Sequence, residues 1–330
     1  MKTDRQMLAV NEQLTNDQVG GMKKKILVAV DGSYCSLNEI HYLSKLFAGH
    51  DDIAIHLITI VSGSLPPSSE WLDEEDKMNM LSPEARKKIN LAKKHLREEA
   101  AFLTHHGLKE DQVSSDMQLS RGGIANDLIG EMHKGTYDAL VIARRGLGKL
   151  QELVLGSVTT TILEKCFNVP IWIIDGEIDS RRFLVPVDGS WRTLKAVDHL
   201  SFMLANVPDV EIALFHSLSW LTPKKILDLD KFCDLWGKKW CDTHLSGPAA
   251  IFTGPEQLLR ENGFDMTKVI RIEESRGPVA ALDIILELRD NKYGTIVMGR
   301  RGPDEPKGIF GGVPGQVLRT VNGVAVWLVN

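Results

Sequence analysis

At roughly 150 residues per domain, the 330 residues of the chain predict two domains. Hydrophobic residues make up 43% of the sequence and charged residues 25%, which argues against a disordered chain or a fibrous fold. The 39 basic and 44 acidic side chains leave a net charge of −5 and no overall basic field for nucleic acid. No apolar run approaches the roughly 18 residues of a membrane span, and residues 1–21 lack the apolar segment of a secretory signal. We therefore expect a cytoplasmic protein that binds neither nucleic acid nor membrane.

Four cysteines, Cys35, Cys166, Cys233 and Cys241, are too few and too scattered for a disulfide framework or a CxxC zinc site. The ten histidines form neither an HExxH nor an HxH motif, so we expect no metal site.

Residues 1–21 show no periodicity and predict a mobile N-terminal arm. Short apolar runs then alternate with helical segments, which is typical of strands buried on both faces of a parallel sheet. The strands expected in the first part of the chain are residues 25–30, 53–61, 113–120, 137–143 and 169–174.

The clearest predicted helix begins at Ser82, where serine can cap the helix and Pro83 sacrifices no hydrogen bond. Gly107 ends it. Its apolar face is predicted from residues spaced three or four apart: Ala85, Ile89, Ala92, Leu96, Ala100 and Leu103.

The second part of the chain repeats the first. The segments ILVAVDGS, ALVIARRG and VPIWII, which begin at residues 26, 139 and 169, recur as FLVPVDGS, TIVMGRRG and VAVWLV at offsets of 157, 156 and 155 residues. Matches in the same order at a nearly constant offset predict two copies of one domain, residues 22–177 and 182–330. Each copy is expected to form a five-stranded, mostly parallel open sheet with helices on both faces.

Ligands of such sheets bind beyond the carboxyl ends of the strands, where the strand order reverses. In the first copy, this edge is expected to hold Asp31 after the first strand and a glycine-containing loop after the fourth. The loop ends at Gly156-Ser157, where a helix begins. A helix start offers N–H groups, a hydroxyl and a positive dipole to a phosphate, although Gly-Ser is also an ordinary helix cap.

This loop resembles the nucleotide loop of the universal stress protein family, G-x2-G-x9-G-S/T, and Asp31 and Asp188 match the family's aspartate after the first strand. The chain therefore resembles a tandem universal stress protein across nearly all of residues 23–330. The resemblance implies an adenine-nucleotide-binding fold used in the stress response, with ATP, ADP or AMP, and Mg²⁺ as the accompanying ion. The positions that it assigns to the nucleotide site of the first copy are Asp31, Ile60, Ala143, Arg145, Gly146, Gly156, Ser157 and Val158.

The first copy departs from the family pattern at Ala143, which stands in place of a glycine. The second copy departs further, because Val313 stands where the family has a hydroxyl residue, and Asp304 and Glu305 lie in its loop. Its degenerate site is expected at Asp188, Gly299, Gly302, Gly312 and Val313, and the acidic loop opposes ATP by charge repulsion. We rank the first copy as the nucleotide site.

Paired arginines, Arg144-Arg145 and Arg300-Arg301, follow the fourth strand of both copies. Three roles stay open for them: a grip on phosphate, a solvated loop face, or an ion pair across an interface.

Trp172 and Trp327 hold matching places in the last strand of each copy. In the resembled family, this strand commonly pairs with its counterpart across a dimer. We expect the two strands to pair within this chain, which would cover both exposed edges, and a homodimer of the whole chain stays open.

Three classes of function remain. The first is a nucleotide-binding regulatory protein with at most slow ATP hydrolysis and no dedicated catalytic residue. The second is a non-catalytic interaction scaffold that binds no nucleotide in either copy. The third, an enzyme of adenylation or phosphoryl transfer, is disfavoured because no carboxylate pair or phosphate-binding lysine is present.

Overall fold

The computed structural model describes residues 23–330 apart from 63–78, 146–154, 222–229, 248 and 303–310. The expected N-terminal arm, residues 1–21, lies outside this part of the chain. The described strands form one ten-stranded sheet in the order β3-β2-β1-β4-β5-β10-β9-β6-β7-β8. Their bounds are Lys24–Ala29 (β1), Ile53–Val61 (β2), Val113–Leu119 (β3), Ala139–Ala143 (β4), Ile171–Ile174 (β5), Arg182–Pro186 (β6), Glu211–Ser217 (β7), Val269–Glu274 (β8), Thr295–Gly299 (β9) and Ala325–Val329 (β10).

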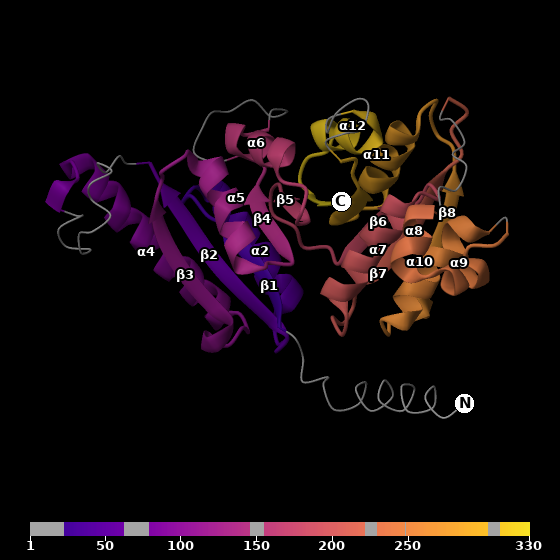
Figure 1. The fold of residues 1–330 in the computed structure, drawn as a ribbon, viewed down its shortest axis with the longest axis horizontal. Helices are drawn as coiled ribbons and strands as arrows, with labels where there is room; N and C mark the ends of the chain where they lie inside the picture. Colours follow the sequence, from indigo (N-terminus) through magenta and orange to yellow (C-terminus); the bar gives the residue numbers. More distant parts are fainter. Residues whose placement is uncertain (1–22, 63–78, 146–154, 222–229, 248, 303–310) are drawn as a thin grey trace.

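The first half of the chain supplies β1–β5 and the second half β6–β10, and these halves lie on the left and right of Figure 1. Within each half all neighbouring strands are parallel. The first strand of each half lies between the second and the fourth, so the strand order reverses beside β1 and beside β6. The expected α/β fold class is confirmed.

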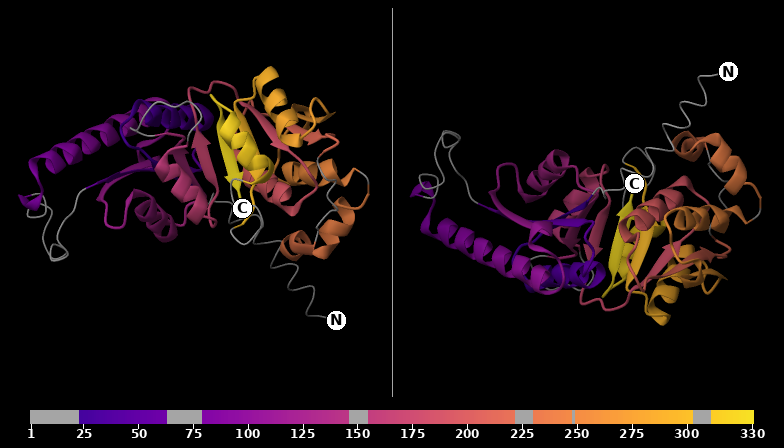
Figure 2. Two further views of the ribbon diagram at one scale, coloured as in Figure 1. Left: turned by 90° about the horizontal axis from the view of Figure 1, so that it is seen from above. Right: turned by 90° about the horizontal axis from the view of Figure 1, so that it is seen from below.

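One antiparallel pair, β5 with β10, joins the two parallel sheets. Trp172 lies opposite Trp327 in this pair, and the two indole rings stack with their centroids 3.6 Å apart and their planes 4° apart. Both side chains are fully buried. Figure 2 shows β5 and β10 side by side at the centre of the molecule. No open edge remains on either of these strands, because each has a neighbour on both sides.

Helices cover both faces of the sheet, and each face has a core that runs through both halves. One core packs beneath α2, α4, α7 and α10, together with the short helices α8 and α9. The other packs beneath α5, α6, α11 and α12. The bounds are Tyr34–Phe47 (α2), Pro83–His105 (α4), Ile124–Gly135 (α5), Ser157–Lys165 (α6), Trp191–Leu204 (α7), Asp230–Trp236 (α8), Lys238–His244 (α9), Ala250–Glu261 (α10), Ala280–Asp290 (α11) and Gly312–Thr320 (α12), with 3-10 turns at Glu110–Gln112 and Met266–Lys268. Within the described ranges, none of the helices has the length and apolar character needed to span a membrane.

Helix α4 begins as its sequence predicts, with the Ser82 hydroxyl accepting a hydrogen bond from the Ala85 amide at 3.2 Å. Its buried face includes Ile89, Leu96 and Leu103. Glu99 is buried on the same face, a carboxyl group among apolar side chains that the prediction did not include.

Candidate functional site

The turn between β1 and α2 places Asp31 at the carboxyl edge of the sheet. The Ser33 amide donates to the Asp31 carboxylate at 2.9 Å, and the Ser33 hydroxyl caps α2 by accepting from the Ser36 amide at 3.3 Å. Gly32 has a φ of +72°, and a Cβ at this position would lie 1.9 Å from Nδ1 of His95 on α4. Both the backbone conformation and the close approach of the imidazole therefore require glycine. Asp31 itself is exposed.

Glu99 lies beneath this turn and is only 3% exposed. The hydroxyl of Ser36 lies 3.3 Å from Oε1 of Glu99, whereas Oε2 has no hydrogen-bond partner among the described residues. Burial raises the pKa of Glu99 to about 7, and the nearby Asp31 carboxylate adds to this rise. Sequence reasoning missed Glu99, although its place three residues after Leu96, on the predicted apolar face, was the signal that could have found it.

Ile60 lies near the end of β2 and is 8% exposed. The hydroxyl of the neighbouring Thr59 donates to the Val30 carbonyl at 2.9 Å and so ties the ends of β2 and β1 together. This contact places Ile60 at the same edge as Asp31.

The exit of β4 is tied to the start of α6 by two hydrogen bonds. The Gly156 amide donates to the Arg144 carbonyl at 3.0 Å, and the Thr159 hydroxyl donates to the Ala143 carbonyl at 3.0 Å. A Cβ on Gly156 would lie 3.5 Å from the Arg144 carbonyl oxygen, an ordinary contact. Because β4 pairs with β1, the start of α6 lies at the edge that carries Asp31.

Ser157 is exposed in the first turn of α6, and Val158 is half-buried against the core. Nη2 of Arg145 lies 3.4 Å from the carboxylate of Asp175. The structure thus brings the predicted site residues of the first half to one edge, except Gly146, which lies outside the described residues.

Arg144 follows β4 at this edge, but its side chain reaches the second half. Its side chain is 1% exposed, and Nη1 donates to the carbonyl of Val321, the C-cap residue of α12 in the second half. Nη1 also lies 3.5 Å from the Asp175 carboxylate. Of the three roles left open for the paired arginines, Arg144 comes nearest to the interface role, but its contact with the second half is a hydrogen bond to a backbone carbonyl, and its ion pair is with Asp175 of its own half.

The second half has a similar turn after β6. The Asp188 carboxylate accepts from the Ser190 amide at 3.0 Å and from the Thr193 hydroxyl at 2.9 Å. A Cβ on Gly299 would lie 2.5 Å from the Arg192 carbonyl oxygen, so the first turn of α7 packs directly on this glycine. Helix packing therefore accounts for Gly299 without a ligand.

The end of the glycine loop has a different backbone in the two halves. Gly302 follows Arg301 and is half-buried, and the loop residues 303–310, with Asp304 and Glu305, lie outside the described residues. Gly156 precedes α6 with a φ of −61°, whereas Gly312, at the start of α12, has a φ of +76°, which is not a helical conformation. Val313 therefore follows this glycine as Ser157 follows Gly156, as the sequence motif pairs them.

This backbone difference does not alter the chemistry of the second site. Gly312 and Val313 both lack a hydroxyl, and the Val313 side chain packs against the core beneath α12. The described residues of this half therefore offer no hydroxyl at the start of the helix.

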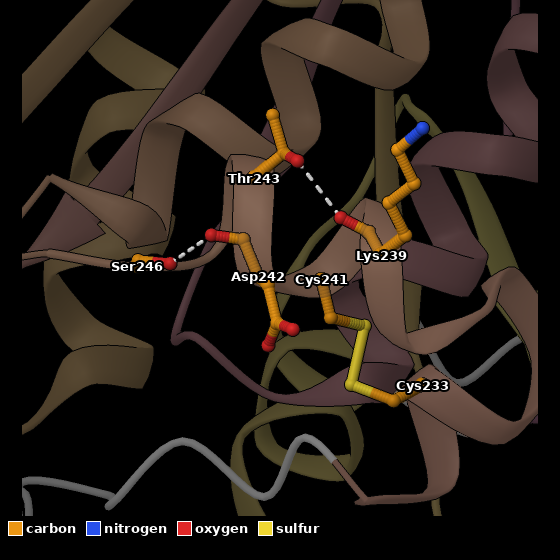
Figure 3. The surroundings of a disulfide bond; sticks show 6 residues. All are labelled: Cys233, Lys239, Cys241, Asp242, Thr243 and Ser246. Carbon is orange, nitrogen blue, oxygen red and sulfur yellow. Dashed lines mark hydrogen bonds between the residues drawn. A yellow bond between two sulfur atoms is a disulfide. The ribbon is translucent and has the colours of Figure 1, made fainter.

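A disulfide joins Cys233 on α8 to Cys241 on α9 (Figure 3). The number and spacing of the cysteines predicted no disulfide framework and did not indicate this single pair. Gly237, with a φ of +88°, forms the turn between the two short helices and brings their cysteines to a Cα–Cα distance of 5.8 Å. Cys166 is a buried free thiol. No group of three or more metal-ligating side chains occurs in the ranges that the structure describes.

Comparison with known proteins identifies the first half directly. The sequence model of the universal stress protein family matches residues 22–175. Residues 22–175 thus form a domain of that family. No curated protein matches its sequence.

Two solved structures are similar to this chain along both halves. A universal stress protein from Archaeoglobus fulgidus DSM 4304 is 20% identical and has a TM-score of 0.60; the match covers 93% of this chain and 98% of that one. A protein of unknown function from Pseudomonas aeruginosa PAO1 is 15% identical and has a TM-score of 0.50, with 93% and 92% covered. At these identities the likeness supports the fold, and it extends over β6–β10 as well as β1–β5.

Proposed function

We propose that this chain is a two-domain universal stress protein that binds an adenine nucleotide, ATP, ADP or AMP, at the carboxyl edge of its first half. The observation that carries the proposal is the start of α6, where Gly156 and the exposed Ser157 lie at the edge that also holds Asp31. The first turn of a helix leaves N–H groups without intrahelical acceptors and has a positive partial charge. Both properties favour a phosphate group.

The remaining residues of this edge fit a nucleoside. The exposed Asp31 carboxylate can accept hydrogen bonds from ribose or base donors, and Ile60 supplies apolar surface. The Ala143 carbonyl accepts a hydrogen bond from Thr159. The methyl of Ala143 is the departure from the family pattern that a bound nucleotide would meet in this half. Mg²⁺ would be held chiefly by the phosphates, because the described residues provide no cluster of ligands.

We propose further that the site of the second half is degenerate. Neither Gly312 nor Val313 can donate a hydroxyl hydrogen bond, and α7 closes on Gly299. Turnover of ATP in the first half is expected to be slow, because the described residues of either site place no general base beside the start of the helix.

Calorimetric titration of ATP into the Gly156→Trp and Gly312→Trp variants tests the proposal. An indole at Gly156 would occupy the space beside the helix start, so we expect binding to be lost in Gly156→Trp and retained in Gly312→Trp. Loss in Gly312→Trp alone would reverse the ranking of the two halves. A wild-type chain that binds no adenine nucleotide would refute the proposal.

An interaction scaffold is the second candidate, and one observation favours it. Exposed apolar side chains gather where β7 and β8 end, and the Leu221 amide donates to the Pro278 carbonyl at 3.1 Å to hold the two loops together. Trp220 in this group is 78% exposed. The group consists of Leu218, Trp220, Leu221, Val279 and Leu282. Several exposed apolar side chains on two joined loops are typical of a protein contact.

Mass spectrometry of small molecules released from the purified protein separates the two candidates. Co-purified ATP, ADP or AMP supports the nucleotide function. A ligand-free chain that also shows no calorimetric signal with ATP supports the scaffold.

A further inference from the structure

The C-terminal end of α6 is held by the second half of the chain. Arg300 follows β9, and its Nη1 donates to the Leu163 carbonyl at 3.0 Å, while Nη2 donates to the carbonyl of the C-cap residue Cys166. Nδ2 of Asn330, directly after β10, donates to the Phe167 carbonyl at 2.8 Å. Three donors from the second half thus converge on the C-terminal end of α6 and the residues that directly follow it.

Arg300 has no acidic partner in the described ranges. Its side chain is 2% exposed, and burial lowers the pKa of its guanidinium to about 10. A buried cation needs compensation, and the C-terminal carbonyls of a helix carry a partial negative charge. The main electrostatic partner of Arg300 is therefore the end of α6.

The corresponding contact of the first half with α12 involves a carboxylate as well as the helix end. Arg144 donates to Val321 at the end of α12, but its charge is also balanced by Asp175 at 3.5 Å. Each half therefore donates hydrogen bonds to the end of the helix that follows the glycine loop of the other half. Because Arg300 has no carboxylate partner in the described ranges, its contact depends more fully on the carbonyl groups of α6.

We infer that Arg300 is a positioning residue for the proposed nucleotide site. Arg300 fixes the axis of α6 from its C-terminal end, while hydrogen bonds from Gly156 and Thr159 fix the end that would meet the phosphates. A nine-residue helix is about 14 Å long and transmits a tilt at one end to the other. This inference rests on the proposed function, and it makes the second half a required part of the first half's site.

The experiment compares ATP affinity, measured by calorimetry, in the wild-type chain and in Arg300→Met, Arg300→Lys and Tyr42→Phe. The control Tyr42→Phe removes another buried bond between the halves, from the Tyr42 hydroxyl to Thr295 at 2.9 Å, without touching α6. We expect the Kd to rise at least tenfold in Arg300→Met, two- to threefold in Arg300→Lys, which keeps a donor, and less than twofold in Tyr42→Phe. Asn330→Ala removes one donor with little loss of packing and is expected to raise the Kd two- to threefold, which keeps the test valid if Arg300→Met does not fold.

Hydrogen exchange of the α6 amides, measured without ATP, separates this inference from the proposed function. Faster exchange at residues 162–166 in Arg300→Met than in wild type and Tyr42→Phe is expected. Equal ATP affinity in wild type and Arg300→Met would overturn the inference while leaving the proposed function standing. A wild-type chain without ATP binding would refute the proposed function, and unchanged exchange in Arg300→Met would then overturn the claim that Arg300 orders α6.

Discussion

The turns after β1 and β6 share the sequence Asp-Gly-Ser, and their backbones agree closely. Gly32 and Gly189 have φ values of +72° and +71°, and in both turns the serine amide donates to the aspartate two residues earlier. The surroundings differ. The hydroxyl of Ser36 lies against the buried Glu99, whereas the hydroxyl of the corresponding Thr193 returns to Asp188 in its own turn.

The helix packed over each turn causes this difference. Helix α4 brings His95 onto Gly32 and places Glu99 beneath the first turn. Helix α10 presents Gly254, which packs against Leu194 and Leu245. A repeated motif therefore conserves the local backbone, while a helix from elsewhere in the same half determines whether the motif lies over an ionisable group or an apolar one.

The β5–β10 pair, which we call the seam between the halves, shows the opposite behaviour, because there the two copies contribute matching residues. Trp172 and Trp327 stack in the centre, and we expect Trp172→Ala and Trp327→Ala each to lower the free energy of unfolding by roughly 3–5 kcal/mol. The double variant should cost less than the sum, because each ring is a main neighbour of the other. Denaturant unfolding followed by circular dichroism measures all three variants.

The exposed Trp220 provides the control for this prediction, since Trp220→Ala is expected to change stability by no more than about 0.5 kcal/mol. A large cost in only one seam variant would show that the two copies do not contribute equally to the seam.

The buried Glu99 of the first half makes the stability of the protein depend on pH. The unfolded chain ionises this carboxyl group near its ordinary pKa of 4.5, whereas the folded chain keeps the proton up to about pH 7. The folded state therefore binds more protons between these values, and stability falls as the pH rises from 4.5 to 7. Glu99→Gln should remove this loss, so that the variant gains on the order of 3 kcal/mol above pH 7 and nothing below pH 4.5. Thermal unfolding across pH 4–8 measures the gain.

Glu98→Gln is the matched control, because Glu98 is exposed on the same helix and pairs with Lys94 at the surface. Its effect should stay within about 0.5 kcal/mol at every pH. A pH-independent gain in Glu99→Gln would show that relief of packing, rather than ionisation, stabilises the variant.

The sequence predicted much of the fold because the regular spacing of apolar residues indicates which positions are buried. The run from Ile53 to Val61 gave the observed strand, and the capping residue Ser82 gave the observed start of α4. The constant offset between repeated segments predicted a second copy of the same topology. These features depend on local backbone chemistry or on alternation, and both can be seen in a single sequence.

The side-chain partners could not be predicted in the same way. The spacing of Glu99 places it on the buried face of α4, but its approach to Ser36 depends on how α2 packs against that helix. Arg144 follows a ligand-binding edge in sequence, yet its side chain reaches the other half of the chain. Cys233 and Cys241 meet because Gly237 reverses the chain between them.

The smallest expected effect tests how far the two Asp-Gly-Ser turns are equivalent. Ser33 and Ser190 cap α2 and α7 by accepting from amides at 3.3 and 3.4 Å. Ser33→Ala and Ser190→Ala should each lower the free energy of unfolding by about 1 kcal/mol, and Ser33→Asp and Ser190→Asp, which retain a capping oxygen, should restore most of the loss. Denaturant unfolding at pH 8 measures the four variants. Suppose that Ser33→Ala lowers the free energy of unfolding clearly more than Ser190→Ala, and that Ser33→Asp does not restore the loss. Ser33 would then stabilise the surroundings of Glu99 as well as the helix cap, and the two turns would be equivalent in their backbone alone.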